Sequence, residues 1–374
     1  MAKKIHISLV GAQREPVYNG IKQTTPDMVV LVHSERTEGD AKAVQNMFTD
    51  TDIDFTLIQM KATQYSAIME TALQINTIVK PGENEVSLNL VGGTKFWALA
   101  FFDVFRDTSA HIMLISQNGI VTDLRSMQET VLDESLDLDT HFRLQGNPLN
   151  QFTPFDEYTE DDYRSVKTIE RAFRYNYGQL KEMTMNQNYL PASGSIEGRY
   201  DSYSYIEWSS SRDATIKLTQ RGREETFHLN SEHALKLLFN FNWFEYKVAR
   251  MLSHWPRSSE IWCNCIFQPV ENIDPNRVKN EVDIILKAGS KVFFIECKTS
   301  IYNSTDIDKF KAVTDNYGSM SSKAVFITNA DIDDTAREKF HDHKIIHFCL
   351  EAAGPNKEQE LFHLLNEEIN NINA

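Results

Sequence analysis

Short apolar segments alternate with longer helical stretches over residues 1 to about 125, and this alternation restricts the possible folds more than any other feature of the sequence. Short runs that are apolar throughout are typical of strands buried on both faces of a parallel sheet. Strands are expected at 4–11, 27–34, 54–60, 85–93 and 111–117, and helices at 38–48, 63–79 and 94–105. This part of the chain is therefore predicted to form a doubly wound, Rossmann-like α/β sheet, which binds ligands beyond the carboxyl ends of its strands.

Two of these strand ends, residues 10–14 (VGAQR) and 91–95 (VGGTK), suit an anion. Glycines allow close backbone approach, Thr94 can cap the following helix, and the helix N-terminus together with Lys95 attracts negative charge. The alternative is a tight strand–helix turn without a ligand. A dinucleotide cofactor and ATP hydrolysis are disfavoured, because the turn contains neither Gly-x-Gly-x-x-Gly nor a Walker lysine.

Two β-rich runs in the second half of the chain, residues 280–287 and 291–298, carry charged residues in their interior. Charged side chains are costly to bury unless they are paired or bind a metal. Gly289 and Ser290 suit a two-residue hairpin turn, in which the first position favours glycine. Ala288 is then expected to pair with the residue after Ser290, which sets the register of the whole hairpin.

This register brings charged side chains together. Counting outward from the turn, Asp283 faces Glu296 and Glu281 faces Lys298, and alternate residues share one face of a strand. Three carboxylates and an ammonium suit metal-dependent phosphodiester cleavage, because carboxylate oxygens bind Mg²⁺ or Mn²⁺ and the cation activates water. The Cys297 carbonyl is predicted as a further ligand. The alternative is a solvated strand face that carries an ion pair.

Composition sets further expectations. The net charge of −15 disfavours a general electrostatic grip on nucleic acid, although a local positive channel remains compatible with it. The four cysteines show no disulfide pattern, which favours a reducing cytoplasm. No apolar run approaches the length of a membrane span, and the N-terminus lacks a signal peptide, so a cytoplasmic protein that does not enter the membrane is predicted.

The hairpin with Asp283 and Glu-x-Lys at 296–298 resembles the PD-(D/E)xK core of restriction-endonuclease-like nucleases, although Val282 stands where a proline is usual. A helix is expected before it at 233–255 and a helix and a strand after it, which gives an αβββαβ order. The resemblance implies that Glu245, on the preceding helix, points at the metal. The alternative is an exposed glutamate paired with a basic residue of the same helix.

The stretches SLVGAQREPVYNGIK, PDMVVLVHSERT and LVGGTKFWALAF resemble a CARF domain, and the whole chain is similar to the CARF-nuclease effectors of type III CRISPR systems. The resemblance implies that the first domain binds a cyclic oligoadenylate, usually the tetramer, across a homodimer. It also implies that binding activates metal-dependent cleavage of single-stranded RNA and DNA, and in some members of the family nicking of supercoiled DNA. The residues at matching strand ends that it places near the ligand are Gln13, Arg14, Gly92, Gly93, Thr94, Lys95 and Ser116.

The predicted organisation is therefore a CARF domain at 1–130, a linker helix and small antiparallel sheet at 131–230, and a PD-(D/E)xK nuclease domain at 231–374. The expected cofactors are Mn²⁺ or Mg²⁺, with cyclic tetra-adenylate as allosteric activator. Two alternatives stay open at this point. One is a plain DNA restriction or repair nuclease without second-messenger control, and the other is a catalytically idle nucleotide-binding adaptor.

Overall fold

A seven-stranded sheet of order β3-β2-β1-β4-β5-β6-β7 organises the first of two units, Met1–Pro148, in this computed structural model; the second is Leu149–Ala374. The structure describes residues 2–61, 63–116, 119–132, 136–185, 187, 189–199, 203–268, 281–300, 305–319 and 322–370. The elements of the first unit are β1 (Lys4–Leu9), α1 (Glu15–Thr24), β2 (Met28–His33), η1 (Glu35–Thr37), α2 (Glu38–Asn46), β3 (Asp54–Gln59), α3 (Tyr65–Val79), β4 (Glu85–Asn89), α4 (Lys95–Phe105), β5 (His111–Ile115), β6 (Ile120–Asp123), β7 (Glu129–Val131) and α5 (Leu138–Gln145).

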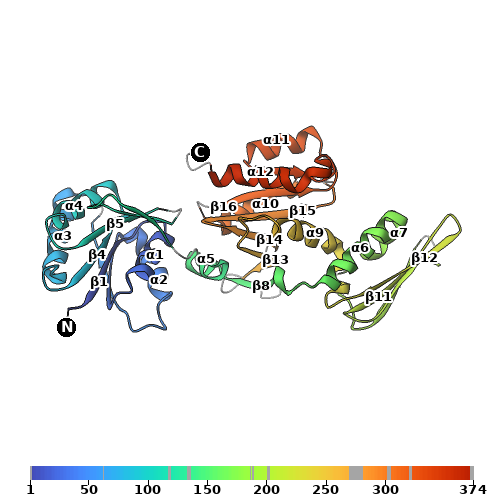
Figure 1. Cartoon of the computed structure of the whole chain (residues 1–374), viewed down its shortest axis with the longest axis horizontal. Helices are drawn as coiled ribbons and strands as arrows, with labels where there is room; N and C mark the ends of the chain where they lie inside the picture. The colour runs from blue at the N-terminus through green and yellow to red at the C-terminus, as the bar shows by residue number, and fades with distance from the viewer. Residues whose placement is uncertain are drawn as a thin grey trace. The chain divides into compact units, whose positions relative to one another are not determined.

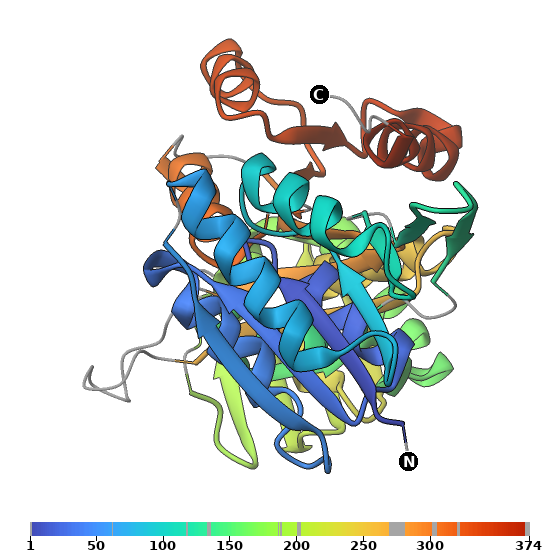
Figure 2. The same cartoon turned by 90° about the vertical axis from the view of Figure 1, so that its left-hand side faces the viewer.

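Helices cover both faces of this sheet. The apolar residues of α3 and α4 pack with Ile5, Ile7 and Leu9 of β1 on one face, and those of α1 and α2 pack with Val29 and Leu31 of β2 on the other (Figure 1). Figure 2 looks onto the face that α3 and α4 cover. Strands β1 to β5 run parallel, so the predicted doubly wound α/β fold is confirmed.

An antiparallel extension of this sheet was not predicted from the sequence. Strand β6 pairs antiparallel with β5, and β7 pairs antiparallel with β6. The β5–β6 turn includes Gly119 at φ +71°, and the Ser116 hydroxyl accepts a hydrogen bond from the Ile120 amide at 3.0 Å. These two strands are too short and too polar to be recognised in the sequence, because strands near the edge of a sheet need to bury only one face.

The second unit contains a six-stranded sheet of order β17-β16-β15-β14-β13-β8 and a four-stranded sheet of order β12-β11-β10-β9. Its elements are β8 (Leu149–Pro154), η2 (Phe155–Glu157), α6 (Glu160–Tyr175), α7 (Tyr177–Thr184), β9 (Gly194–Glu197), β10 (Tyr205–Ser210), β11 (Asp213–Gln220), β12 (Arg223–Asn230), α8 (Ala234–Leu238), η3 (Phe239–Phe241), α9 (Asn242–Ser253), β13 (Glu260–Phe267), β14 (Glu281–Ala288), β15 (Lys291–Lys298), α10 (Thr305–Tyr317), β16 (Ser322–Thr328), α11 (Asp334–Asp342), β17 (Ile346–Cys349), η4 (Gly354–Asn356) and α12 (Lys357–Asn370).

The order α9-β13-β14-β15-α10-β16 is the predicted αβββαβ arrangement. The helix expected at 233–255 is interrupted, however. Asn240 and Phe241 adopt left-handed φ angles of 55° and 66°, which separate α8 from α9. The Asn240 side chain bonds the main chain of Gln187 at both its oxygen and its nitrogen, which stabilises this break.

The region predicted as a separate middle part shares its core with the rest of the second unit. One hydrophobic cluster runs from Ile169 of α6 and Ile216 of β11 to Phe244 of α9 and Ile284 of β14. Helix α5, by contrast, lies within the first unit. Among the described residues, no helix combines the length and apolar character that a membrane crossing requires.

Candidate functional site

The β14–β15 hairpin has the register that the turn predicts. Ala288 pairs with Lys291, and the pairing continues residue by residue to Ile284 opposite Ile295. Gly289 has φ +58°, as the first position of the turn requires. One further step in the same register places Asp283 opposite Glu296. β14 is buried along all but its first residue, because β13 and β15 flank it.

Asp283, Glu296 and Lys298 converge on one face of this hairpin. The Lys298 Nζ lies 2.5 Å from Glu296 Oε1 and 3.7 Å from Asp283 Oδ2. The main-chain N–H of Cys297 donates a hydrogen bond to Asp283 Oδ2 at 2.7 Å, so this side chain takes the place of a main-chain acceptor just beyond the last pair of β14 and β15, Ile284 with Ile295. The two carboxylate side chains are only 11% and 15% exposed, whereas that of Lys298 is 37% exposed.

Glu245 of α9 belongs to the same group and is not the exposed, locally paired glutamate of the alternative interpretation. Its Oε2 accepts a hydrogen bond from Asn264 Nδ2 of β13 at 2.9 Å. The basic neighbours on its helix pair elsewhere, Lys247 with Glu170 at 2.8 Å and Arg250 with Glu160 at 3.1 Å. Glu281, the exposed first residue of β14, also acts electrostatically on Glu245. We call Asp283, Glu296, Glu245, Glu281 and Lys298 the carboxylate cluster.

Burial and mutual repulsion perturb the protonation of this cluster. Burial, and after it the negative charge of Asp283, raises the pKa of Glu296 to about 8, against the opposing effect of Lys298. Burial and the charges of Asp283 and Glu281 raise the pKa of Glu245 well above its ordinary value. The pKa of Lys298 is also raised, because the charges of Asp283 and Glu296 outweigh its desolvation. One ammonium therefore compensates the buried carboxylates incompletely.

The chemistry of this cluster fits a hard divalent cation. Among the described residues, no three His, Cys, Asp or Glu side chains converge closely enough to form a metal cage by themselves. The donors are nevertheless carboxylate oxygens, which Mg²⁺ and Mn²⁺ prefer, and a cation would oppose the burial and the repulsion by Asp283 that raise the pKa of Glu296. Asp283, Glu296 and Glu245 would hold such an ion. Their role as ligands, and that of the Cys297 carbonyl, stays a prediction.

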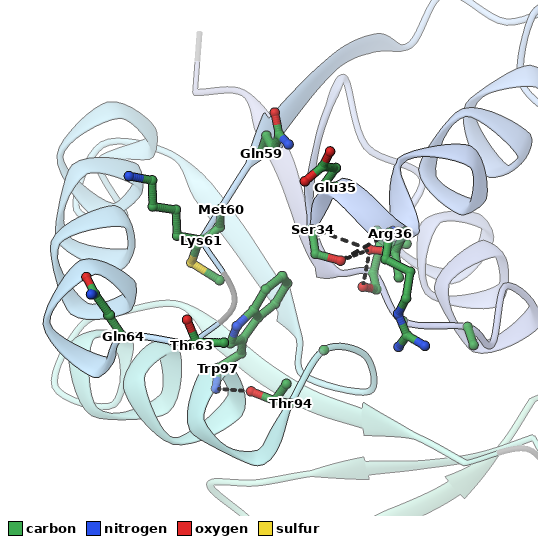
Figure 3. A pocket seen from close by; sticks show the side chains of 15 residues that line it. Ser34, Glu35, Arg36, Gln59, Met60, Lys61, Thr63, Gln64, Thr94 and Trp97 are labelled. Atoms are coloured by element: carbon green, nitrogen blue, oxygen red, sulfur yellow. Dashed lines mark hydrogen bonds between the residues drawn. The ribbon is translucent and has the colours of Figure 1, made fainter.

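A separate pocket of about 1030 Å³ opens at the carboxyl ends of β1, β2 and β3 in the first unit. Figure 3 shows Lys61, Thr63 and Gln64 on one side of the opening and Ser34, Glu35 and Arg36 on the other, with Trp97 beside Thr94. The lining residues are Val10, Gly11, Ala12, Ser34, Glu35, Arg36, Thr37, Gln59, Met60, Lys61, Thr63, Gln64, Gly93, Thr94 and Trp97. Arg36 and Lys61 supply positive charge to this pocket.

Two of the predicted ligand residues, Gly93 and Thr94, line this pocket. Thr94 Oγ1 accepts a hydrogen bond from the Trp97 amide at 3.4 Å and caps α4, as predicted. Gly93 has φ +74°. A Cβ at Gly92 would lie 1.9 Å from the Leu9 carbonyl oxygen, so the turn packs against the end of β1 and tolerates only glycine there.

The other candidates lie outside the lining of the pocket as far as the described residues define it. Arg14 donates to Asp40 Oδ1 at 2.7 Å and to the Leu144 carbonyl of α5 at 2.7 Å, so its guanidinium joins α1 to α2 and α5. Ser116 stabilises the β5–β6 turn. For Gln13, Arg14, Gly92, Lys95 and Ser116, contact with a ligand stays a prediction.

Sequence reasoning missed the larger part of the pocket lining, which follows β2 and β3. Ser34 and Thr37 form a capping box, with the Thr37 amide bonded to Ser34 Oγ at 3.3 Å and the Ser34 amide to Thr37 Oγ1 at 3.0 Å. A Ser or Thr after a buried strand, followed by polar residues, was the available signal. The rule that ligands bind at strand ends applies to β2 and β3 as much as to β1.

Comparison with known proteins found a family model that matches the first unit and solved structures that are similar to both units. Residues 5–136 match the family model of the Card1 CARF domain. The fold is similar to that of Can2 from Sulfobacillus thermosulfidooxidans in complex with cyclic tetra-adenylate, with a TM-score of 0.66, 19% identity, and coverage of 99% of this chain and 100% of that one. Protein VC1899 from Vibrio cholerae gives a TM-score of 0.74 at 14% identity, over 98% of both chains.

A third similar structure is a type III CRISPR defence DNA nuclease activated by cyclic oligoadenylate. The TM-score is 0.56 at 13% identity, and the match covers 87% of this chain but only 45% of that longer one. No curated protein matches the chain. At these identities the likeness to solved structures establishes the fold of the whole chain, while the family match concerns its first unit.

Proposed function

We propose that this chain, whose first unit is a CARF domain of the Card1 type, is a metal-dependent endonuclease that cyclic oligoadenylate activates in type III CRISPR antiviral defence. The observation that carries the proposal is the convergence of Asp283, Glu296 and Lys298 on one face of a buried hairpin. The proposed substrates are single-stranded RNA and DNA, with supercoiled DNA as a further one. The four free cysteines suit a cytoplasmic location.

The pocket of the first unit is the proposed binding site for the activator, and cyclic tetra-adenylate is the proposed ring. Ser34 and Thr94, the N-cap residues of η1 and α4, line this pocket. The N-termini of both helices therefore lie at the pocket, and helix N-termini attract phosphate groups. Arg36 and Lys61 would add charge-assisted contacts. The likeness to Can2, whose structure contains cyclic tetra-adenylate, supports this ligand.

A homodimer is proposed because apolar side chains on α3 and α4 are exposed, and both helices begin next to residues that line the pocket. Tyr65, Leu73, Ile78, Phe96 and Leu99 are each between 47% and 63% exposed. An apolar patch of this kind on a protein surface marks an interaction site. A two-fold pairing through α3 and α4 would bring the two pockets together, which suits a ring whose phosphates repeat around a two-fold axis.

The carboxylate cluster is the proposed catalytic centre. Asp283, Glu296 and Glu245 would hold Mn²⁺ or Mg²⁺, and Glu281 would act at the margin of the site. The cation supplies a water of lowered pKa and neutralises charge on the phosphate. Lys298 keeps its proton because the surrounding carboxylates raise its pKa, so it can orient the attacking water or stabilise charge on the transferred phosphoryl group.

The test is a cleavage assay of the full chain with Mn²⁺ and labelled RNA and DNA, with and without cyclic tetra-adenylate. We expect cleavage only when both are present, and its loss by at least about a hundredfold in Glu296→Gln, because the metal would lose a charged ligand. Glu338→Gln, at an exposed position of α11, is the matched control and should behave as wild type.

Each rival function predicts a different result of this assay. Cleavage that is independent of cyclic tetra-adenylate would indicate a plain restriction or repair nuclease. Binding of the ring without any cleavage would indicate an idle adaptor. Full activity of Glu296→Gln would remove the carboxylate cluster as the catalytic centre, whatever the activator does.

A further inference from the structure

Asn264 lies in line with the catalytic carboxylates and has no role in the function described so far. On β13, Cys263 pairs with Ile284 and Cys265 with Val282, so Asn264 stands opposite Asp283 of β14. Glu296 lies one residue beyond Ile295, the last residue of β15 that pairs with β14, and Lys298 lies close to both Asp283 and Glu296. Residues directly opposite each other on neighbouring strands share a face of the sheet. Asn264 therefore occupies the third position of a row whose other two members are Asp283 and Glu296.

The main chain at Asn264 departs from a regular strand. Its φ is +52°, in the left-handed region, which Asn tolerates better than other residues with a side chain. The pairing of β13 with its other neighbour, β8, shifts register between Cys263 and Ile266. Such irregularities re-aim a side chain and occur next to active sites. The backbone at Asn264 thus interrupts the regular strand pairing and directs the side chain toward Glu245.

The contacts of the Asn264 amide point to a function beyond packing. Its Nδ2 donates to Glu245 Oε2 at 2.9 Å, although the residue is only 7% exposed. Its Oδ1 is buried and, among the described residues, has no hydrogen-bond partner. A buried carbonyl oxygen without a donor is unfavourable, and native structures satisfy nearly all of them. The orphan acceptor lies on the side chain that holds a carboxylate of the cluster.

We propose that Asn264 is a positioning residue of the nuclease centre. Its Nδ2–H group donates a hydrogen bond that holds Glu245, and its Oδ1 accepts a hydrogen bond from a water molecule. A neutral amide is suited to this place, because it donates to one carboxylate without adding charge between Glu245 and Asp283. The inference rests on the proposed function. It goes beyond it by assigning Glu245 its partner and by giving β13 a part in the site.

The test compares Asn264→Gly with wild type in the full chain. Glycine keeps the left-handed backbone and removes only the amide. Calorimetric titration with Mn²⁺ in the absence of nucleic acid should show affinity reduced about tenfold or more, as for other partners of metal ligands. With saturating cyclic tetra-adenylate, kcat should fall by a similar factor while KM for the labelled strand changes less than about twofold. Unchanged Mn²⁺ affinity and kcat would overturn the proposal.

Asn240→Gly is the matched control, because Asn240 is also a left-handed Asn in the second unit but bonds Gln187 instead of the cluster. It should leave Mn²⁺ affinity unchanged. A residue that acts through Glu245 must also lose its effect when Glu245 is altered. In a Glu245→Ala background, which lacks the acceptor, Asn264→Gly is therefore expected to add less than about twofold, and fully additive effects would contradict the proposal.

If Asn264→Gly does not fold, Asn264→Ala replaces it, because alanine likewise removes the amide and adds no charge to the cluster. The same coupling with Glu245→Ala is expected, and additive losses again count against the proposal. The controls separate the two levels of inference. Wild type that neither binds Mn²⁺ nor cleaves overturns the proposed function and this inference together, whereas an active wild type with an equally active Asn264→Gly overturns only the inference.

Discussion

At the scale of single residues, the carboxylate cluster is defined by its charge. Two nearly buried carboxylates contact one ammonium, and a third acidic side chain, Glu245, lies beside them. The consequence is that Glu296 takes up a proton in the folded protein at a pH where an exposed glutamate is ionised. A cation would have to displace this proton, so proton and metal compete for the site.

The pKa of Glu296 predicts how stability depends on pH when metal is chelated. Since its folded-state pKa is about 8 and its ordinary value is 4.5, the folded protein binds the extra proton between these limits. The free energy of unfolding in EDTA should therefore fall as pH rises through this window. Glu296→Gln should flatten that fall, measured by urea midpoints at several pH values. Equal slopes in Glu296→Gln and the control Glu338→Gln would show that Glu296 is not protonated there.

The site residues that could be predicted are held by contacts between neighbours in the sequence, whereas the others are held by contacts between distant segments. The pairing of Asp283 with Glu296 follows from a two-residue turn, so a local count along the chain was enough. Asn264 is brought to the same site by pairing of β13 and β14, and nothing in the neighbouring sequence indicates its left-handed φ. Arg14 likewise bonds α5 through the tertiary fold, which a strand-end pattern cannot reveal.

At the scale of elements, the turn between β4 and α4 depends on its glycines. We predict that Gly92→Ala weakens binding of cyclic tetra-adenylate by at least about tenfold, because the new methyl group would collide with the Leu9 carbonyl and move the turn away from the pocket. The measurement is a binding titration of the full chain. Mn²⁺ affinity should stay at the wild-type value, since the substitution lies in the other unit.

Gly82→Ala is the control for this prediction, because a Cβ at that glycine of the same unit would meet no atom of the described residues within 4 Å, apart from its chain neighbours. It should bind the ring as wild type does. Wild-type affinity in Gly92→Ala would mean that the β4–α4 turn does not shape the binding site.

Strands rich in apolar and β-branched residues were readily predicted, and elements whose form depends on tertiary contacts were not. The composition of β1 to β5 indicates strands, and so does that of β14 and β15. The break between α8 and α9 could not be predicted, because Leu, Phe and Asn at 237–242 keep a helical pattern while Asn240 is held by Gln187 from another segment. The short strands β6 and β7 depend in the same way on the edge that β5 offers.

At the scale of the whole molecule, the two units are joined closely along the chain. Helix α5 ends at Gln145 and β8 begins at Leu149, so residues 146–148 span at most about 11 Å. Within the first unit, Arg14 bonds the Leu144 carbonyl, and Glu15 contacts His141 of α5. Arg14 and Glu15, which contact α5, directly follow the loop at 10–13 that borders the pocket. We therefore expect a shift of that loop to move α5, the helix that precedes the second unit.

This connection predicts the effect of lengthening it. Four Gly and Ser residues inserted between Asn147 and Pro148 should leave affinity for cyclic tetra-adenylate within about twofold, but reduce activated cleavage by about tenfold or more, because a flexible linker transmits position poorly. The same insertion in the β11–β12 turn, at Arg221 and Gly222, is the control and should have little effect on activation. Full activation in the first variant would show that coupling does not depend on this connection.

The place of β8 also bears on the order in which the protein is made. The sheet of the first unit is complete once residue 131 has been synthesised, so it can fold early, as N-terminal domains generally do. Strand β8 follows almost at once, but its partner β13 ends only at Phe267, after all of α6 to α9. During synthesis β8 is therefore a strand without its partner strand, attached to a domain that can already have folded, and the six-stranded sheet of the second unit cannot be completed until β13 to β17 have been synthesised.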